Sequence, residues 1–258
     1  MILPKIIEEK KREVDRAQKR ISLSAMKKKA ESLYIRSMFK KNISRKGHIN
    51  LIAEIKKSSP SKGVIRPSFE PIKIALTYQA AGASALSVLT DERFFDGKLE
   101  YLHLVKERVT IPVLRKEFII DEYQVYESAV NGADAILLIA HILTQEELNR
   151  YFSIAKELGM DILVEVHNEE ELDKALASPA SIIGINNRDL TSFNMDIATT
   201  QKLIRLIPEN KVIVAESGIK SYEQVMFLKS LGVNAVLIGE IFMRTKNIGE
   251  KVRQLMRE

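Results

Sequence analysis

Eight short apolar segments recur along this chain, and each is followed by a charged, amphipathic segment of helical length. The apolar segments are residues 51–55, 84–89, 111–114, 134–139, 161–166, 181–186, 211–215 and 234–238. The amphipathic segments are residues 70–81, 98–108, 121–131, 144–158, 168–177, 196–206, 221–231 and 247–257. Eight strand-then-helix units are the number that closes a (β/α)8 barrel. We therefore predict an α/β fold: one TIM barrel domain over residues 1–258, with residues 1–47 as an N-terminal helical extension.

Three of the helix-to-strand turns are similar in sequence, which supports a repeated unit. They read Ala81-Gly-Ala-Ser-Ala-Leu, Asn131-Gly-Ala-Asp-Ala-Ile and Leu231-Gly-Val-Asn-Ala-Val. We expect the glycine to end each helix, because it adopts the left-handed backbone conformation common at helix C-termini. A doubly wound open sheet is the alternative architecture. That fold usually has a glycine-rich turn after its first strand, and this chain has none there.

Composition limits the chemistry that is available. The chain has no cysteine, which excludes disulfides, thiolate nucleophiles and cysteine-based metal sites. Its histidines never stand four residues apart, which argues against a histidine metal site. The first residues lack the apolar core of a signal peptide, and no apolar run approaches the ~18 residues of a membrane span. We expect a cytoplasmic protein without a membrane partner.

The first 47 residues form a basic arm. They hold 15 of the 40 basic residues but 5 of the 34 acidic ones, so the arm carries +10 and the remainder −4. Such an arm could bind nucleic acid. However, its apolar residues recur at helical intervals and its charges lie between them, which is typical of a helix with a solvated charged face. We expect no nucleic-acid partner.

The first predicted strand carries charges that an apolar strand would not contain without a use. Glu54 and Lys56 stand two residues apart, so both side chains point into the space that the sheet encloses. Burying them is costly unless each is paired or used. The segment 58–63, Ser-Ser-Pro-Ser-Lys-Gly, then offers hydroxyls, backbone N–H groups and a cation. We infer an anion-binding loop in which Ser59 takes part.

Charged or amide side chains stand at the ends of six of the eight predicted strands, where barrel enzymes build their sites. Each has a simpler alternative: a lysine there is usually a solvated surface group, Glu165 could belong to a buried salt bridge, and Asn186 could cap a loop. Gathered at one end of one barrel, they favour acid/base chemistry, because neighbouring charges shift one another's pKa values. The members are Glu54, Lys56, Arg115, Lys116, Glu117, Glu165, Asn186, Arg188, Glu216 and Glu240.

The loops after the last two strands favour a phosphorylated small-molecule substrate. In barrels of this kind these loops usually bind phosphate. Ser217-Gly218 and Gly239-Glu240 offer unhindered backbone N–H groups at these positions.

Six motifs, in chain order, resemble the indole-3-glycerol phosphate synthase family. They are EIKKSSPSKG (54–63), SVLTDERFFDG (87–97), PVLRKEF (112–118), LVEVH (163–167), GINNRDL (184–190) and ESGI (216–219). The resemblance implies a barrel with a helical extension that acts in tryptophan biosynthesis as a carboxy-lyase. Its substrate would be 1-(2-carboxyphenylamino)-1-deoxyribulose 5-phosphate, which ring closure, decarboxylation and dehydration convert to indole-3-glycerol phosphate. No cofactor and no metal are implied.

The resemblance also implies residue roles. Lys116 would be the general acid, Lys56 would hold the substrate carboxylate, and Glu165 and Glu54 would accept protons or stabilise a cation. The residues implied to orient the sugar and the ring are Asn186, Arg188 and Glu216. Those implied to contact the phosphate are Ser59, Ser217, Gly218, Gly239 and Glu240, and those implied to form an apolar slot for the anthranilate ring are Phe95, Phe118 and Leu137.

Two rival functions remain open at this point. One is another phosphate-binding barrel isomerase such as phosphoribosylanthranilate isomerase, a family that tends to use a cysteine or an aspartate pair. The other is a non-catalytic barrel that binds a phosphorylated metabolite. The set Lys56, Lys116 and Glu165 argues against the second, because binding alone does not need proton donors and acceptors together. Ile241 stands where the family often has a small residue, so phosphate binding there should use backbone N–H groups. We expect a monomer, with other oligomeric states open.

Overall fold

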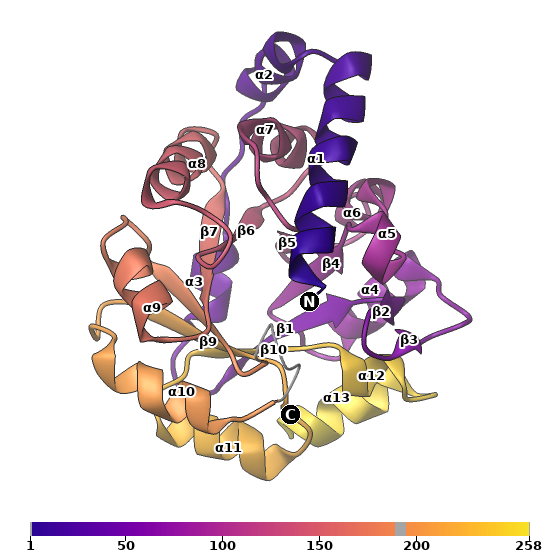
Figure 1. Ribbon diagram of the computed structural model, residues 1–258. Coiled ribbons are helices and arrows are strands. Elements are labelled where there is room, and N and C mark those ends of the chain that lie inside the picture. Colours follow the sequence, from indigo (N-terminus) through magenta and orange to yellow (C-terminus); the bar gives the residue numbers. More distant parts are fainter. Residues whose placement is uncertain (1, 189–194, 258) are drawn as a thin grey trace.

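Eight parallel strands close into a barrel in the computed structural model, which describes residues 2–188 and 195–257. Around the barrel the order is β1-β10-β9-β8-β7-β6-β5-β4, so consecutive strands of the chain are neighbours (Figure 1). The strands are β1 (Asn50–Ile55), β4 (Ala85–Leu89), β5 (Val113–Lys116), β6 (Ala135–Ile139), β7 (Asp161–Val166), β8 (Ile182–Asn186), β9 (Val212–Glu216) and β10 (Ala235–Ile238). The predicted (β/α)8 barrel is confirmed, and the open-sheet alternative is wrong.

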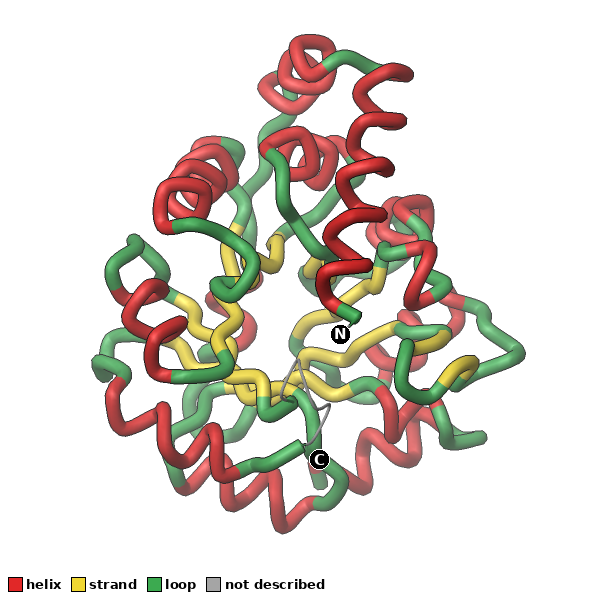
Figure 2. Tube along the Cα trace, viewed as in Figure 1, coloured by secondary structure: helices red, strands yellow, loops and turns green. Residues whose placement is uncertain are grey.

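Helices surround the ring of strands (Figure 2). They are α4 (Pro71–Ala80), α6 (Leu99–Lys106), α7 (Glu122–Val130), α8 (Gln145–Glu157), α9 (Glu169–Leu176), α10 (Ala198–Leu203), α11 (Tyr222–Ser230) and α13 (Ile248–Met256). A short 3-10 turn, η1 (Ile204–Leu206), extends α10. The predicted glycine turns are confirmed, since Gly82, Gly132 and Gly232 follow their helices with φ of +93°, +83° and +93°.

The N-terminal extension folds as three helices, α1 (Leu3–Arg20), α2 (Leu23–Glu31) and α3 (Phe39–Ile43). Phe39 and Ile43 of α3 are fully buried and pack with the apolar side chains inside the barrel. At the other end, the start of α1 contributes Leu3, Ile6 and the preceding Ile2 to the wall of a pocket at the barrel mouth. The extension therefore contacts both ends of the barrel.

One charge of the extension is not solvated as the sequence pattern indicated. Lys10 is 2% exposed on the inner face of α1. Its Nζ lies 2.6 Å from Glu13, 2.9 Å from Asp91 and 3.0 Å from Glu117. The last two carboxylates stand just beyond β4 and β5, so this ammonium joins α1 to two strand ends. The expectation of a wholly solvated charged face is wrong for Lys10, because its three acidic partners replace water.

Three short elements inserted after strands were not anticipated. A hairpin of β2 (Ser58–Ser59) and β3 (Gly63–Val64) follows β1, α5 (Glu92–Phe95) follows β4, and α12 (Glu240–Met243) follows β10. Asp91 caps α5 by accepting hydrogen bonds from the backbone N–H groups of Phe94 (2.8 Å) and Phe95 (3.1 Å). All three lie at the carboxyl ends of strands and so shape the mouth of the barrel.

Candidate active site

A pocket of about 400 Å³ opens at the carboxyl ends of the strands. That volume lies in the range of sites that hold a small-molecule ligand. Every residue to which the family resemblance gives a role lines it: Glu54, Lys56, Ser59, Phe95, Lys116, Phe118, Leu137, Glu165, Asn186, Arg188, Glu216, Ser217, Gly218, Gly239 and Glu240. The chain thus brings these residues together from positions up to 186 residues apart, between 54 and 240.

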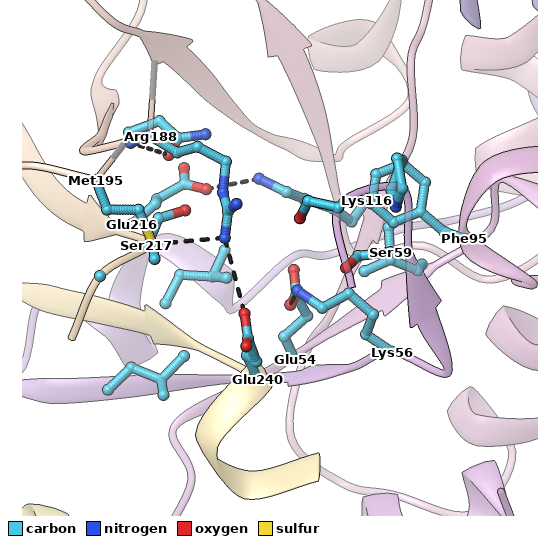
Figure 3. Close-up of a pocket in the computed structure, with 18 of the residues that line it drawn as sticks. Glu54, Lys56, Ser59, Phe95, Lys116, Arg188, Met195, Glu216, Ser217 and Glu240 are labelled. Atoms are coloured by element: carbon cyan, nitrogen blue, oxygen red, sulfur yellow. Dashed lines mark hydrogen bonds and ion pairs between the residues drawn. The ribbon is translucent and has the colours of Figure 1, made fainter. Parts of the chain in front are cut away.

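Lys116 forms ion pairs with two carboxylates across the floor of the pocket. Its Nζ lies 2.7 Å from Glu165 Oε2 and 2.6 Å from Glu216 Oε2. Lys116 ends β5, Glu165 lies near the end of β7, and Glu216 ends β9, so three strands hold the triad. Both glutamates are almost fully buried. Figure 3 shows Lys116 directed into the pocket with Glu54 and Lys56 beside it.

Burial and mutual charge set the protonation of this triad. Burial opposes the charge of Lys116, but Glu165 and Glu216 outweigh it and raise the pKa of the ammonium. Burial also opposes the charge of Glu165, yet Lys116 and His167 hold the pKa of that carboxyl far below its usual range. For Glu216, burial together with repulsion from Glu165 prevails over Lys116 and raises the pKa to about 7. The triad therefore pairs a firmly ionised carboxylate with one that exchanges a proton near neutrality.

Glu54 and Lys56 form a second ion pair at the end of β1. Glu54 is 5% exposed and packs directly against the backbone of Gly239. A Cβ at Gly239 would stand 2.7 Å from Glu54 Cβ, closer than such atoms approach. The predicted inward orientation of Glu54 and Lys56 is confirmed, and the absence of a side chain at Gly239 is what makes room for the carboxylate.

The loop after β8 contributes Asn186 and Arg188. Asn186 Oδ1 accepts a hydrogen bond from the backbone N–H of Arg188 at 3.0 Å, so it both caps the loop and lines the pocket. The Arg188 guanidinium reaches across to Glu240 Oε2 at 3.8 Å (Figure 3). Residues 189 and 190 of the GINNRDL motif lie outside the described residues.

The turn after β9 has two successive residues in the left-handed backbone region. Ser217 has φ +64° and Gly218 has φ +77°. Such a conformation is strained for a serine, and strain of this kind concentrates at functional sites. Across the pocket, Ser59 Oγ is buried and has no hydrogen-bond partner among the described residues. These groups all line the pocket, and they are among those that the sequence indicated for binding an anion.

One wall of the pocket is apolar. Phe95 and Phe118 lie with ring centroids 6.1 Å apart, and Leu137 of β6 lines the pocket as well. Ile2, Leu3 and Ile6 of α1 join this lining, and the sequence reasoning missed them. Their regular spacing had indicated packing of α1 on the barrel but not where on the barrel.

Other supporting residues were also missed. Asn187 is 2% exposed, and its Nδ2 donates to the carbonyls of Glu216 (3.1 Å) and Ser217 (3.2 Å), which ties the β8 and β9 ends together. Gly184 lies so close to Glu216 that a Cβ there would collide with its carboxylate. Arg115, which precedes Lys116, faces the helices and bonds to Glu127 at 2.9 Å, so it does not enter the pocket. The motif GINNRDL contained both Gly184 and Asn187, but nothing in their types indicated these contacts.

No group of three or more histidine, aspartate or glutamate side chains in the described part of the chain is arranged to hold a metal ion. A bilayer-spanning helix is likewise not found among residues 2–188 and 195–257, since none there combines sufficient length with an apolar composition.

Comparison with known proteins decides the family. The family model described as indole-3-glycerol phosphate synthase matches residues 3–255. The chain belongs to the indole-3-glycerol phosphate synthase family. An indole-3-glycerol phosphate synthase of Acetivibrio thermocellus is 48% identical over 256 residues, which cover 98% of each chain. Another, of Caldanaerobacter subterraneus subsp. tengcongensis, is 50% identical over 261 residues, covering 98% of this chain and 99% of the relative.

Solved structures share the architecture of this family at low sequence identity. The 3-hexulose-6-phosphate synthase of Salmonella typhimurium superposes with a TM-score of 0.66 at 13% identity, covering 81% of this chain and 97% of that one. At that identity the likeness shows the fold alone. The resemblance to indole-3-glycerol phosphate synthase is thus confirmed by the family match, and neither the isomerase nor the binding-protein alternative is favoured.

Proposed function

We propose how this pocket performs the reaction of its family, a carboxy-lyase step of tryptophan biosynthesis. The substrate, 1-(2-carboxyphenylamino)-1-deoxyribulose 5-phosphate, is converted to indole-3-glycerol phosphate, CO2 and water. The observation that carries the proposal is the ammonium of Lys116, held at 2.7 Å and 2.6 Å between the buried carboxylates of Glu165 and Glu216. An acid in contact with a base is what a ring closure followed by a dehydration requires.

Ring closure begins when the aromatic carbon that bears the carboxylate attacks the ribulose carbonyl. Lys116 donates a proton to the carbonyl oxygen as negative charge develops there. The raised pKa of Lys116 ensures that this proton is present at neutral pH. The transfer becomes favourable because the forming alkoxide is a stronger base than the carbonyl.

Decarboxylation follows on the same carbon. Ring closure leaves a cation conjugated with the ring nitrogen, and loss of CO2 delivers the bonding electron pair to that cation. Lys56 holds the carboxylate until CO2 departs, and its pairing with Glu54 keeps it directed into the pocket. Because the substrate supplies its own electron sink, the step needs no cofactor.

Dehydration completes the indole. The hydroxyl formed at ring closure leaves as water after it gains a proton from Lys56, and the adjacent carbon gives up a proton. Glu165 is the proposed proton acceptor, because its low pKa keeps it ionised, and Glu54 stabilises the intermediate cation. Glu216, with a pKa of about 7, orients the sugar hydroxyls with Asn186.

The remaining candidates bind the ends of the substrate. We assign the phosphate to the Ser59 hydroxyl and the backbone N–H groups of Ser217, Gly218, Gly239 and Glu240. We assign the anthranilate ring to the apolar wall formed by Phe95, Phe118 and Leu137, with Arg188 at the pocket edge. We propose that the protein acts as a monomer, because one chain supplies every one of these groups. We also propose that it acts in the cytoplasm, where a phosphorylated substrate would be found.

The experiment is turnover of this substrate followed by the fluorescence of the indole product. We expect product from the wild type and a loss of about 10²–10⁴-fold in kcat for Glu165→Gln. Glu157→Gln is the control, because Glu157 is exposed at the end of α8. A folded wild type that forms no fluorescent product would overturn the proposal, and a Glu165→Gln variant that loses its fold would reassign Glu165 to a structural salt bridge.

A further inference from the structure

A line of ionisable side chains leads from the proposed base Glu165 away from the pocket. Glu165 Oε2 faces Lys116, and its other oxygen, Oε1, lies 3.3 Å from His167 Nε2. His167 follows β7 directly, and its side chain is 8% exposed. It lies behind Glu165 and is absent from the described residues that line the pocket. Each oxygen of Glu165 therefore lies near a basic side chain, Lys116 at one and His167 at the other.

The line continues through Glu171 of α9 to the surface. His167 Nδ1 lies 2.8 Å from Glu171 Oε2, which also accepts from the His167 backbone N–H at 2.9 Å. Glu171 Oε1 lies 2.8 Å from Nδ1 of His141, a side chain that is 50% exposed. Asn168 fixes Glu171 from the start of α9: their side chains bond at 2.9 Å, and Asn168 Oδ1 caps the Glu171 N–H at 2.9 Å. The helix start thus places Glu171 against the imidazole.

The contacts of His167 favour a charged ring. Its Nδ1 is hydrogen-bonded to Glu171 Oε2 at 2.8 Å, and its Nε2 lies 3.3 Å from Glu165 Oε1, an ion-pair contact without hydrogen-bond geometry. In a neutral imidazole that donates from Nδ1, the Nε2 lone pair would face this anion. An imidazolium carries an N–H on each nitrogen and attracts both carboxylates. The pKa agrees, since Glu165 and Glu171 outweigh burial and raise it to about 10.

We propose that His167 is a positioning residue of the reaction: as an imidazolium fixed by Glu171, it orients Glu165 and keeps that carboxylate ionised until it accepts its proton from the substrate. The inference rests on the proposed role of Glu165. Lys116 cannot do this task alone, because once it gives its proton to the substrate it no longer attracts Glu165. His167 lies outside the pocket, so its contact with Glu165 persists at that moment.

The other charged side chains around Glu165 explain why a second cation is needed to keep it ionised. Lys116 and Glu216 face Glu165 from β5 and β9, and Glu54 on β1 acts on the same Lys116. When Lys116 is neutral, repulsion from Glu216 favours protonation of Glu165, which would abolish its action as a base. His167 is the cation that opposes this from β7, while Glu171 and His141 face the imidazole on its far side.

The charge on His167 can be tested without any activity measurement. The chain has four histidines, which makes assignment by substitution straightforward. In a long-range ¹H–¹⁵N spectrum at about pH 8.5, two units above the ordinary histidine pKa of ~6.5, one ring should carry protons on both nitrogens. We expect that signal to vanish in His167→Gln and to persist in His103→Gln, an exposed control on α6. A wild type in which every histidine ring is neutral at this pH would overturn the inference.

Kinetics then distinguish positioning from a structural role. Glutamine at 167 retains a donor toward Glu165 but no charge. We expect His167→Gln to lower kcat by roughly 10–100-fold, a part of the 10²–10⁴ that a complete base contributes, with KM changed by less than about threefold. The acidic limb of the kcat profile should move to higher pH, because the pKa of Glu165 rises when the cation is removed.

Glu171→Gln provides a second variant, since it removes the anion that holds the far nitrogen. We expect it to lower the pKa of His167 and to shift the acidic limb in the same direction as His167→Gln, by less. An unshifted limb in both variants, with or without a loss of stability, would contradict the inference. Because the spectrum reports on His167 alone, an inactive wild type with a charged His167 would instead locate the failure in the proposed function.

Discussion

Lys10→Met is expected to destabilise the protein by about 3–5 kcal/mol, the cost of breaking a buried ion pair from one side. Lys10 is 2% exposed and lies within 3.0 Å of three carboxylates. Two of them, Asp91 and Glu117, are themselves buried. Removing the ammonium leaves both carboxylates away from water without their shared cation, and methionine fills the space without restoring charge.

The contacts that Asp91 and Glu117 keep in the variant limit this loss of stability. Asp91 still caps α5 through Phe94 and Phe95. Glu117 still accepts a hydrogen bond from Thr90 at 2.6 Å and lies 3.7 Å from Arg115. Lys10 and Arg115 together outweigh burial and lower the pKa of Glu117, so that pKa should rise in the variant. Protonation of Glu117 would then relieve part of the cost at low pH.

The assay is urea-induced unfolding followed by circular dichroism at neutral pH. Lys11→Met is the matched control, because Lys11 is the exposed neighbour on the same helix, and it should change the free energy of unfolding by no more than about 0.5 kcal/mol. Adding Glu117→Gln to Lys10→Met should recover part of the loss, since it removes one stranded charge. A Lys10→Met variant within about 1 kcal/mol of the wild type would refute the reasoning.

Three further predictions follow from the geometry of the site. The free energy of unfolding should fall as the pH rises from about 6.5 to about 10, and it should fall more steeply in the wild type than in His167→Gln. The raised pKa of His167 contributes stability that is lost as the ring deprotonates over this range. Equal slopes of the two proteins in urea titrations would contradict this. Gly239→Ala should displace Glu54 and lower kcat by at least about 10-fold, whereas Gly249→Ala, with 3.4 Å to its nearest neighbour, should not. Gly218→Ala should destabilise by about 1–2 kcal/mol because φ is +77°, and should weaken competitive inhibition by inorganic phosphate; unchanged inhibition would remove the Gly218 turn from the phosphate site.

The barrel could be predicted because its signal repeats eight times. Each apolar run ends within a few residues of an observed strand, and the glycines at 82, 132 and 232 end helices as their sequence context indicates. The short α5 could not be predicted in this way, because four residues give no periodicity. It depends on the cap from Asp91 and on its place beside the hairpin.

Side-chain direction was predictable where strand alternation applies. The spacing of Glu54 and Lys56 places both in the pocket, while Arg115 turns to the helices and Lys116 to the pocket. Burial by partners distant in sequence was not predictable. Lys10 resembles the exposed lysines beside it, and only the fold brings Asp91 and Glu117 to it. His167 carries no local sign that it would contact Glu165 and Glu171 together.

The most direct test of the central claim is single-turnover formation of indole-3-glycerol phosphate by Lys116→Ala at saturating substrate, followed by indole fluorescence. Lys116 is the proposed acid of ring closure, and its only observed contacts among the described acidic residues are with Glu165 and Glu216. We predict a rate at least about 100-fold below that of the wild type, with substrate still bound by the phosphate loops and by Lys56. A variant that forms product at the wild-type rate would contradict the account.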